Sequence, residues 1–459
     1  MLFSSNVFIF RFLFLFMIVY LLVKPKDRNL VLLFGSLIFY GIGEPHFVWI
    51  LVASIITNYL LAVKILEKKS KVFLIISVIL NFGILGLFKY WDFGIENINA
   101  IAGKEILPLL YLALPLGISF YTFQIVSFQV DCYRGKIKSD ISLLNLATYI
   151  CMFPQLVAGP IVKYEEVEKE LESRTISIEN LEDGFQWFSI GMALKVLLAN
   201  PIGTLWNSVQ TAGTIGLSAS VAWLGAFAYS FQIYFDFWGY SLMALGLGKM
   251  LGFQIPINFN DPYISKSMSE FWRRWHITLG RWFKEYVYIP LGGNRKGQIR
   301  TAFNVFVVWA LTGLWHGASW NFVIWGITFF VLISLEKTFF GELLERYPIV
   351  GHIYVITILP ITWVVFGITN LEQLMQYIGS MFGMHTGAIL TGTEQFFRYL
   401  KTYGVLFVVC ILFATPIPMK LYKKFQGRLF MCLILIAVFF FSVYELMKGS
   451  SNPFLYFRF

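Results

Sequence analysis

Residues 429–446 read LFMCLILIAVFFFSVYEL, an 18-residue stretch whose one charged side chain is Glu445. A stretch of this length and composition can cross the hydrocarbon core of a bilayer, about 30 Å thick, as a single helix. Similar apolar runs recur along the chain, among them residues 47–66, 72–90 and 349–367. The repetition indicates a protein that crosses a membrane many times.

The composition of the whole chain supports this interpretation. Of its 459 residues, 58% are hydrophobic and only 14% are charged, whereas an ordinary soluble protein carries roughly 25% charged residues. So few charges cannot cover the surface of a soluble globule, and so hydrophobic a chain does not stay disordered. The sequence therefore predicts an all-α polytopic membrane protein with roughly 11–14 membrane segments.

Several apolar runs contain Pro and Gly near their middle, most clearly residues 106–130, which include the stretch LPLG at 114–117, and residues 153–160 (FPQLVAGP). Irregular backbone at membrane depth is tolerated only where protein or a water-filled cavity satisfies its hydrogen bonds. We therefore expect some segments to be re-entrant or broken helices that line an interior cavity.

The net charge of +10 is concentrated in short turns between apolar runs, at residues 24–28, 64–71 and 134–138. Because cations collect in cytoplasmic loops, these turns are predicted to lie in the cytoplasm, with the N-terminus outside. The same rule explains the basic composition without nucleic acid as a partner, and basic surface also suits anionic lipid. The expected environment is a lipid bilayer.

Residues 261–300 differ from the rest of the chain because basic and aromatic side chains alternate there. The eight cations are Lys266, Arg273, Arg274, Arg281, Lys284, Arg295, Lys296 and Arg300. Aromatic pairs spaced four apart predict an amphipathic helix over residues 267–289 at the inner membrane interface. Such a helix is compatible with an interfacial anchor and equally with a cationic mouth for an anionic acyl donor.

Two histidines lie in or near this region. His276 ends the stretch RRWH, and His316 lies in LTGLWHGASW (residues 311–320), at a Gly-flanked break between apolar runs. An ionisable residue inside a membrane is a functional candidate by default, although a hydrogen-bonded core histidine is the alternative. A neutral imidazole can accept the proton of an attacking hydroxyl, so the pattern suits acyl transfer from a thioester.

The neighbours of the two histidines are candidates for binding substrate or donor. These residues are Trp272, Arg273, Arg274, Trp315 and Asn321. No C-x-x-C pair, H-E-x-x-H motif or Asp-rich loop is present, so neither a metal site nor a disulfide framework is expected.

Seven stretches carry a family resemblance when they are taken together. They are residues 153–161 (FPQLVAGPI), 234–241 (YFDFWGYS), 258–263 (NFNDPY), 269–276 (SEFWRRWH), 282–294 (WFKEYVYIPLGGN), 315–317 (WHG) and 452–459 (NPFLYFRF). This set resembles the membrane-bound O-acyltransferase (MBOAT) superfamily, and within it the bacterial branch that contains the alginate O-acetyltransferase membrane subunit. The resemblance extends from about Gly117 to the C-terminus.

The resemblance implies one MBOAT-type transmembrane domain over residues 1–459, in the cytoplasmic (inner) membrane of a bacterium. Its parts are N-terminal spans at 1–116, a core with a central tunnel and the histidines at 117–340, and C-terminal spans at 341–459. His316 then corresponds to the family's general base at the centre of the tunnel. His276 corresponds to a second histidine nearer the cytoplasmic mouth, which positions donor or substrate.

The implied activity is transfer of an acetyl group from a cytoplasmic thioester toward the other face, for O-acetylation of a cell-surface or exported polysaccharide. Acetyl-CoA is the expected donor, no bound cofactor is expected, and an extracytoplasmic partner with a Ser-Asp-His esterase-like domain would complete the transfer. Within the superfamily, peptidoglycan O-acetylation and D-alanyl transfer to teichoic acid are alternatives. A transporter is the alternative outside it, although the sequence reveals neither paired intramembrane charges nor inverted repeats.

Overall fold

The computed structural model describes residues 2–137, 140–157, 159–211, 216–384, 392–449 and 455. Lys138, Ala158 and most of the stretch 452–459 lie outside the described residues. Within the described ranges all regular secondary structure is helical and no strand is present.

Seven helices in the described part of the chain are long and apolar enough to cross a membrane. They are Val48–Lys68, Lys71–Lys89, Ile178–Thr211, Trp320–Arg346, Pro348–Gly367, Thr393–Phe413 and Leu429–Met447. A shorter apolar helical stretch covers Phe8–Leu22. The prediction of an all-α polytopic membrane protein is confirmed, with these long helices accompanied by shorter ones.

The chain divides into two compact units. The first comprises Met1–Phe188 and Tyr240–Ile257, and the second comprises Ser189–Gly239 and Asn258–Phe459. The chain passes between them within α10 (Ile178–Ala193) and α12 (Ala219–Met250).

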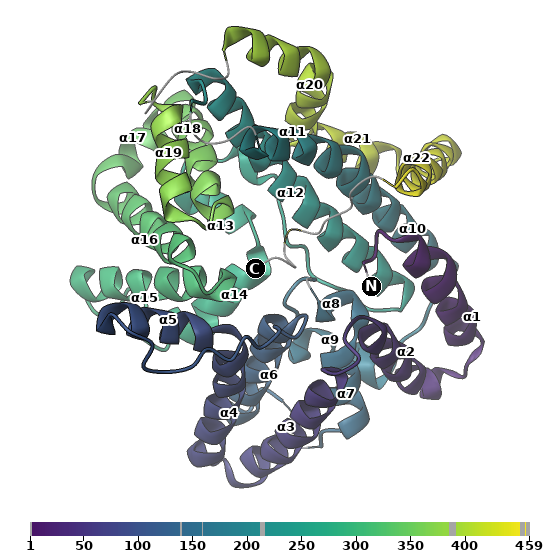
Figure 1. Ribbon diagram of the computed structural model, residues 1–459. Helices are drawn as coiled ribbons and strands as arrows, with labels where there is room; N and C mark the ends of the chain where they lie inside the picture. Colours follow the sequence, from purple (N-terminus) through teal and green to yellow (C-terminus); the bar gives the residue numbers. More distant parts are fainter. Residues whose placement is uncertain are drawn as a thin grey trace. The chain divides into compact units, whose positions relative to one another are not determined.

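The first unit contains a group of packed helices, in which α3 contacts α4, α6 and α7, and α2 contacts α7 (Figure 1). In chain order, the elements of this unit before α10 are η1 (Phe8–Leu13), α1 (Phe14–Leu22), η2 (Pro25–Asp27), α2 (Arg28–Gly43), α3 (Val48–Lys68), α4 (Lys71–Lys89), α5 (Trp91–Ala102), α6 (Ile118–Tyr133), α7 (Leu143–Cys151), α8 (Phe153–Leu156) and α9 (Tyr164–Glu172).

Buried amides join α3, α4 and α6 at their contact. Asn58 Nδ2 donates to Asn81 Oδ1 at 3.1 Å, and Asn81 Nδ2 donates to Asn58 Oδ1 at 2.8 Å. Gln129 Nε2 donates to the carbonyl oxygen of Asn58 at 2.7 Å. Because lipid offers no hydrogen-bond partners, such amide pairs hold membrane helices together.

The expected membrane segment over residues 106–130 starts later than the apolar run does. Residues 104–117 are not helical, and α6 begins at Ile118. Pro108 and Pro115 have no amide hydrogen and so disfavour a helix here. The carboxylate of Asp92 instead accepts the main-chain N–H groups of Leu110 at 2.7 Å and Tyr111 at 2.9 Å.

The second unit contains the closely packed helix pair of α15 and α16, and α16 also packs on α18 (Figure 1). Its elements are η3 (Leu194–Ala199), α11 (Asn200–Thr211), η4 (Pro262–Ile264), α13 (Met268–Arg274), α14 (Ile277–Phe283), η5 (Lys284–Tyr288), α15 (Gln298–His316), α16 (Trp320–Leu335), η6 (Glu336–Phe340), α17 (Gly341–Arg346), α18 (Pro348–Gly367), α19 (Leu371–Met381), α20 (Thr393–Phe413), α21 (Ile417–Phe425) and α22 (Leu429–Met447).

Two glycines allow α15 and α16 to approach so closely. A Cβ atom on Gly313 would lie 2.3 Å from the carbonyl oxygen of Phe322, and one on Gly326 would lie 2.4 Å from that of Trp309. Both obstacles are main-chain atoms of a packed helix, which cannot move aside without separating the two helices.

Gly313→Ala should therefore lower the thermal unfolding midpoint of the protein in detergent, because overpacking of this kind costs about 1–3 kcal/mol. Gly83→Ala on α4 is the matched control, since a Cβ atom there meets nothing within 4 Å and alanine favours a helix over glycine by about 1 kcal/mol. Scanning fluorimetry of the two purified variants measures the difference. Equal shifts in both would contradict the close approach at Gly313.

Candidate functional site

The predicted amphipathic helix over residues 267–289 is broken in the structure, so that prediction is wrong in its continuity. The segment forms the short helices α13 and α14 and the π-helical turn η5. The break falls at Trp275, which is extended, and at His276, whose φ of 45° lies in the left-handed region. A non-glycine residue held there costs roughly 1–3 kcal/mol, and such residues cluster at functional sites.

The main chain of residues 258–260 holds the break open. Ile277 donates its N–H to the carbonyl oxygen of Asn258 at 3.0 Å, and Asn260 donates its N–H to the carbonyl oxygen of Arg274 at 2.9 Å. These two hydrogen bonds replace those that a continuous helix would make, so the distant residues 258–260 decide where α13 ends.

The side chain of Asn258 determines which nitrogen of His276 carries the proton. Asn258 Oδ1 accepts the N–H of Thr278 at 3.3 Å and its hydroxyl at 3.0 Å, and it lies 3.2 Å from His276 Nδ1. Because a main-chain N–H can only donate, the Asn258 atom that faces it must be the oxygen. His276 Nδ1–H is therefore the donor to Asn258, and Nε2 is the basic nitrogen.

His276 is buried, with 1% of its surface exposed. Its ring meets Phe237 edge to face at 4.7 Å and Trp315 at 5.9 Å between centroids. His276 lies between α13 and α14, outside the membrane-spanning helices, and burial lowers its pKa to about 3. The imidazole is therefore neutral at physiological pH.

His316 is the last residue of α15 and is also buried. Its ring is packed edge to face by Trp315 at 5.0 Å, Trp325 at 5.1 Å and Phe366 at 5.1 Å. His316 thus lies in an apolar surrounding at the C-terminal end of α15.

The structure brings both predicted catalytic histidines onto one indole ring, that of Trp315. Trp315 precedes His316 directly in the sequence. It lies 39 positions from His276, so only the fold brings the rings of Trp315 and His276 into contact. We call His276, His316, Trp315, Trp325 and Phe366 the histidine site. Trp325 and Phe366 were not singled out from the sequence, and only their aromatic character signals a role in packing.

Asn321, a predicted substrate-binding residue, forms hydrogen bonds that position the end of α18. Its Nδ2 donates to the carbonyl oxygens of Val365 at 3.2 Å and Phe366 at 3.0 Å. These bonds attach the first turn of α16 to the last turn of α18. They thereby hold the Phe366 ring against His316.

The three predicted donor-binding residues of α13 lie in different surroundings. Trp272 packs edge to face on Trp309 at 4.8 Å and Phe329 at 4.9 Å, within the aromatic core. Arg274 forms an ion pair with Glu270 at 2.9 Å. Arg273 alone of the three is exposed.

The Arg274–Glu270 pair is part of the support of α13. Burial would raise the pKa of Glu270, but hydrogen bonds from the Lys266 N–H and from the Arg274 guanidinium hold the pKa below its usual value. Arg274 also donates to the carbonyl oxygen of Asn260 at 3.1 Å. Its charge is therefore engaged inside the protein.

Arg273 lines a cavity of about 680 Å³ together with Lys266 and Lys337. The acids that also line it are Glu270, Glu336, Glu342 and Glu345. Of these, the buried Glu336 accepts the N–H groups of Met268 at 2.5 Å and Ser269 at 2.9 Å, at the start of α13. Glu336 follows Trp325 by about three helical turns, so this cavity lies along α16 from the histidine site.

A buried ion pair joins Lys195 of η3 to Asp236 of α12. Both side chains are 2% exposed, and Lys195 lies within the candidate span Ile178–Thr211. Asp236 Oδ2 also accepts the N–H of Leu455 at 2.9 Å, and the residue after Asp236, Phe237, touches His276. The sequence did not reveal this pair, in which a lysine of a candidate span meets an aspartate of α12. An acid inside the apolar run 221–252 was the signal that could have found it.

No group of three or more His, Cys, Asp or Glu residues is placed to hold a metal ion within the described residues. The histidine site itself offers two imidazoles, and that of His276 has a defined protonated nitrogen.

Comparison with known proteins identifies relatives along the whole chain. A sequence model of the membrane-bound O-acyltransferase family (MBOAT) matches residues 121–371, which include the histidine site. "Probable alginate O-acetylase AlgI" of Pseudomonas putida is 34% identical, over 100% of both chains. "Peptidoglycan O-acetyltransferase" of Helicobacter pylori is 32% identical over 91% of this chain and 86% of its own. "Teichoic acid D-alanyltransferase" of Bacillus subtilis is 30% identical over 49% of this chain and 59% of its own. These matches confirm the resemblance carried by the motifs.

The low pKa of His276 predicts a stability that depends on pH. In the unfolded chain a histidine titrates near 6.5, so between about pH 6.5 and pH 3 the unfolded state binds a proton that the folded state does not. The free energy of unfolding should then fall by about 1.4 kcal/mol for each pH unit below 6.5. This contribution is present above pH 6.5 and is lost as the pH falls toward 3.

Thermal unfolding midpoints at pH 7.5, 6 and 5 measure this effect. The midpoint of His276→Asn should fall less steeply with acidification than that of the wild type, because asparagine does not titrate. His46→Asn is the control, since His46 is exposed. The same pH slope in all three proteins would contradict a buried neutral His276.

Proposed function

Since the chain belongs to the membrane-bound O-acyltransferase family, and is an O-acyltransferase of a membrane, we propose that it moves an acetyl group from a cytoplasmic thioester toward the extracytoplasmic face. The acetyl group is then used for O-acetylation of a cell-surface or exported polysaccharide. The observation that carries the proposal is the contact of His276 and His316 with one indole, inside the region that the family model covers.

In the proposed reaction His316 is the general base. Its neutral imidazole accepts the proton of an acceptor hydroxyl while the hydroxyl oxygen bonds to the thioester carbonyl carbon. The carbon–sulfur bond then breaks, and the thiolate leaves and takes up a proton. Two features support this role: His316 is buried, and the rings of Trp315, Trp325 and Phe366 shield it from water.

His276 is proposed to position a reactant. Its Nδ1–H is committed to Asn258, so Nε2 is the basic nitrogen, and we propose that a hydroxyl or amide of the donor or acceptor donates to it. Because its pKa is about 3, it stays neutral throughout the reaction and serves better as a hydrogen-bond acceptor than as the base. Trp315 contacts both imidazoles and is proposed to contact the substrate as well.

The donor is proposed to be acetyl-CoA, bound at the cavity of Arg273. Arg273, Lys266 and Lys337 supply three cations for the phosphates of such a polyanion. Two of the four acids there are already engaged, Glu270 with Arg274 and Glu336 with the start of α13. Arg274, Trp272 and Asn321 are proposed to act by positioning α13 and Phe366.

The proposed location is the cytoplasmic membrane of a bacterium. The names of the matched proteins refer to polymers of the bacterial cell surface, which supports the cytoplasmic membrane as the location. An extracytoplasmic partner with a Ser-Asp-His esterase-like domain is proposed to carry the acetyl group to the polymer. The Helicobacter pylori relative, aligned over 91% of this chain, favours peptidoglycan as the second candidate polymer. D-alanyl transfer ranks lower, because that relative aligns with only 49% of the chain.

His316→Ala should reduce the acetyl-ester content of the surface polymer by roughly 10²–10⁴-fold, the usual loss when a general base is removed. The measurement is the acetyl content of polymer from cells that carry the variant in place of the wild type. His276→Ala should also lower acetylation, with a raised KM for donor or acceptor.

His46→Ala is the matched control, because it removes an exposed imidazole outside the family match. All three variants should insert and purify in equal amounts. Unchanged acetylation in His316→Ala would reject the proposed base, and full activity in His276→Ala would assign that residue to structure alone.

Arg273→Gln should raise the KM for acetyl-CoA several-fold and leave kcat nearly unchanged, because Arg273 lies away from the reacting atoms. Donor binding by the wild type should weaken with rising ionic strength, and that of the variant should weaken less. Lys401→Gln on α20 removes an equal charge at another exposed position and should change neither quantity. Donor binding that is indifferent to salt and to Arg273 would favour an interfacial anchor for this segment.

A further inference from the structure

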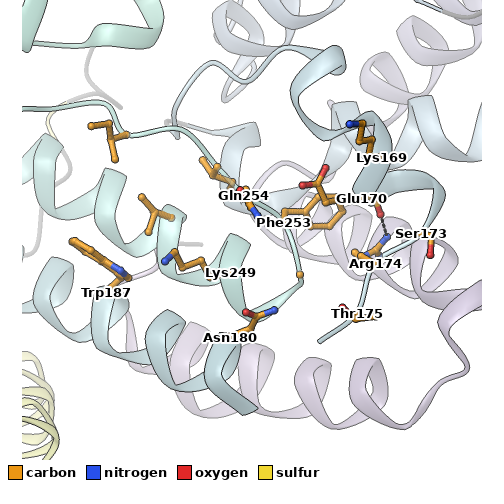
Figure 2. Close-up of a pocket in the computed structure, with 14 residues that line it drawn as sticks. Lys169, Glu170, Ser173, Arg174, Thr175, Asn180, Trp187, Lys249, Phe253 and Gln254 are labelled. Atoms are coloured by element: carbon orange, nitrogen blue, oxygen red, sulfur yellow. Dashed lines mark hydrogen bonds between the residues drawn. The ribbon is translucent and has the colours of Figure 1, made fainter. Parts of the chain in front are cut away.

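A second cavity, of about 690 Å³, lies among residues of the first unit and takes no part in the histidine site (Figure 2). Its walls come from α9, the segment after it, α10, the end of α12 and residues 252–257. Three cations line it, Lys169, Arg174 and Lys249, against one acid, Glu170. A volume of this size is typical of ligand sites.

Arg174 is held rigidly at the edge of this cavity. Its Nε donates to the hydroxyl of Tyr20 at 2.9 Å and to the carbonyl oxygen of Leu251 at 3.1 Å. Its Nη1 donates to Asn29 Oδ1 at 2.6 Å and to the carbonyl oxygen of Glu170 at 2.9 Å. All four acceptors are neutral oxygens, so they orient the guanidinium without cancelling its charge.

The remaining nitrogen of Arg174 is available to a ligand. Nη2 is buried and has no hydrogen-bond partner among the described residues. The Cζ atom of the Arg174 guanidinium lies over the Phe253 ring, 4.5 Å from its centroid. Both residues line the cavity (Figure 2). A guanidinium fork matches the oxygens of a phosphate, and the hydrogen bond that Arg174 donates to Glu170, the acid that lines the cavity, goes to its main-chain oxygen rather than to its carboxylate. The arrangement therefore suits a phosphate group.

The basic turn at residues 24–28 lies next to this cavity. Arg28 Nη1 donates to the carbonyl oxygen of Arg174 at 3.2 Å, which brings the basic turn at residues 24–28 next to it. Lys169 is exposed on α9, whereas Lys249 pairs with Asp183. Cations concentrated in this way mark the cytoplasmic side of a membrane protein and attract anionic lipid.

The same cavity also has an apolar wall, and the end of α1, a helix with exposed apolar side chains, lies beside it. Tyr20, which binds Arg174, is in the last turn of α1, where Val19 and Leu22 are exposed apolar residues. Tyrosine and tryptophan are typical of the membrane–water interface, and Trp187 lines the cavity (Figure 2). Its other apolar walls are Leu245, Phe253, Ile255 and Ile257. A free phosphate would use the cationic part alone, whereas an amphipathic ligand uses both.

We propose that this cavity binds the headgroup region of an anionic glycerophospholipid, with the phosphate on Arg174 Nη2 and Lys169 and the start of the acyl chains along the apolar wall. The lipid would also link α1, α9 and α12, because Arg174 already bonds to residues at the ends of all three.

Native mass spectrometry of the purified full-length protein tests the proposal, after incubation in detergent with phosphatidylglycerol, phosphatidylcholine, inorganic phosphate or coenzyme A. The wild type should retain phosphatidylglycerol in preference to phosphatidylcholine. Arg174→Gln should lower that retention by roughly tenfold or more, as expected for the loss of a charge-assisted hydrogen bond.

Lys169→Gln keeps the test valid if Arg174→Gln fails to fold, because Lys169 is exposed and lies outside the Arg174 hydrogen bonds. It should lower retention several-fold. Lys71→Gln removes an exposed lysine that does not line the cavity and should leave retention unchanged.

Equal retention of the two lipids, or wild-type retention in both cavity variants, would overturn the proposal. Displacement of phosphatidylglycerol by inorganic phosphate or coenzyme A, lost in Arg174→Gln, would assign the cavity to a soluble anion and overturn the lipid as its ligand.

Discussion

One carbonyl oxygen, Oδ1 of Asn258, holds together the segments on which the histidine site depends. It accepts hydrogen bonds from the main chain and the hydroxyl of Thr278 and from Nδ1 of His276. These bonds offset the strain of a left-handed histidine, while the main-chain bonds of Asn258 and Asn260 stop α13 from continuing into α14. They also fix the imidazole as one tautomer, so the same contact that shapes the main chain defines which nitrogen can take part in chemistry.

The close approach of α15 and α16 determines the surroundings of His316. Gly313 and Gly326 allow the two helices to touch through their main chains, and this contact places Trp325 against the His316 ring. The hydrogen bond of Asn321 to the main chain of Phe366 then holds the Phe366 ring against His316. A catalytic group at a helix end can be positioned accurately only when the helices around it are rigid.

Polar groups inside the apolar body are satisfied by one another. Asn58 and Asn81 exchange amide hydrogen bonds, and Lys195 and Asp236 pair while Leu455 donates to the same carboxylate. Because no water can replace a lost partner there, a single substitution in the amide pair or in the ion pair leaves a buried polar or charged side chain without a partner. Unlike the ion pair, the guanidinium of Arg174 has only neutral acceptors, and this difference separates a structural charge from one that can serve a ligand.

The amino-acid sequence by itself determined that the chain is a helical, many-times membrane-spanning protein, and it identified His276, His316 and Trp315. Those conclusions follow from local composition and short motifs, and hydrophobic length is a property of neighbouring residues. Tertiary structure alone decided that α13 ends at Arg274, before His276, that Arg274 and Trp272 support the fold, and that Lys195 meets Asp236. Each of these depends on a partner distant along the chain, such as Asn258 or Asp236, and no local pattern encodes which distant atom will accept a given hydrogen bond.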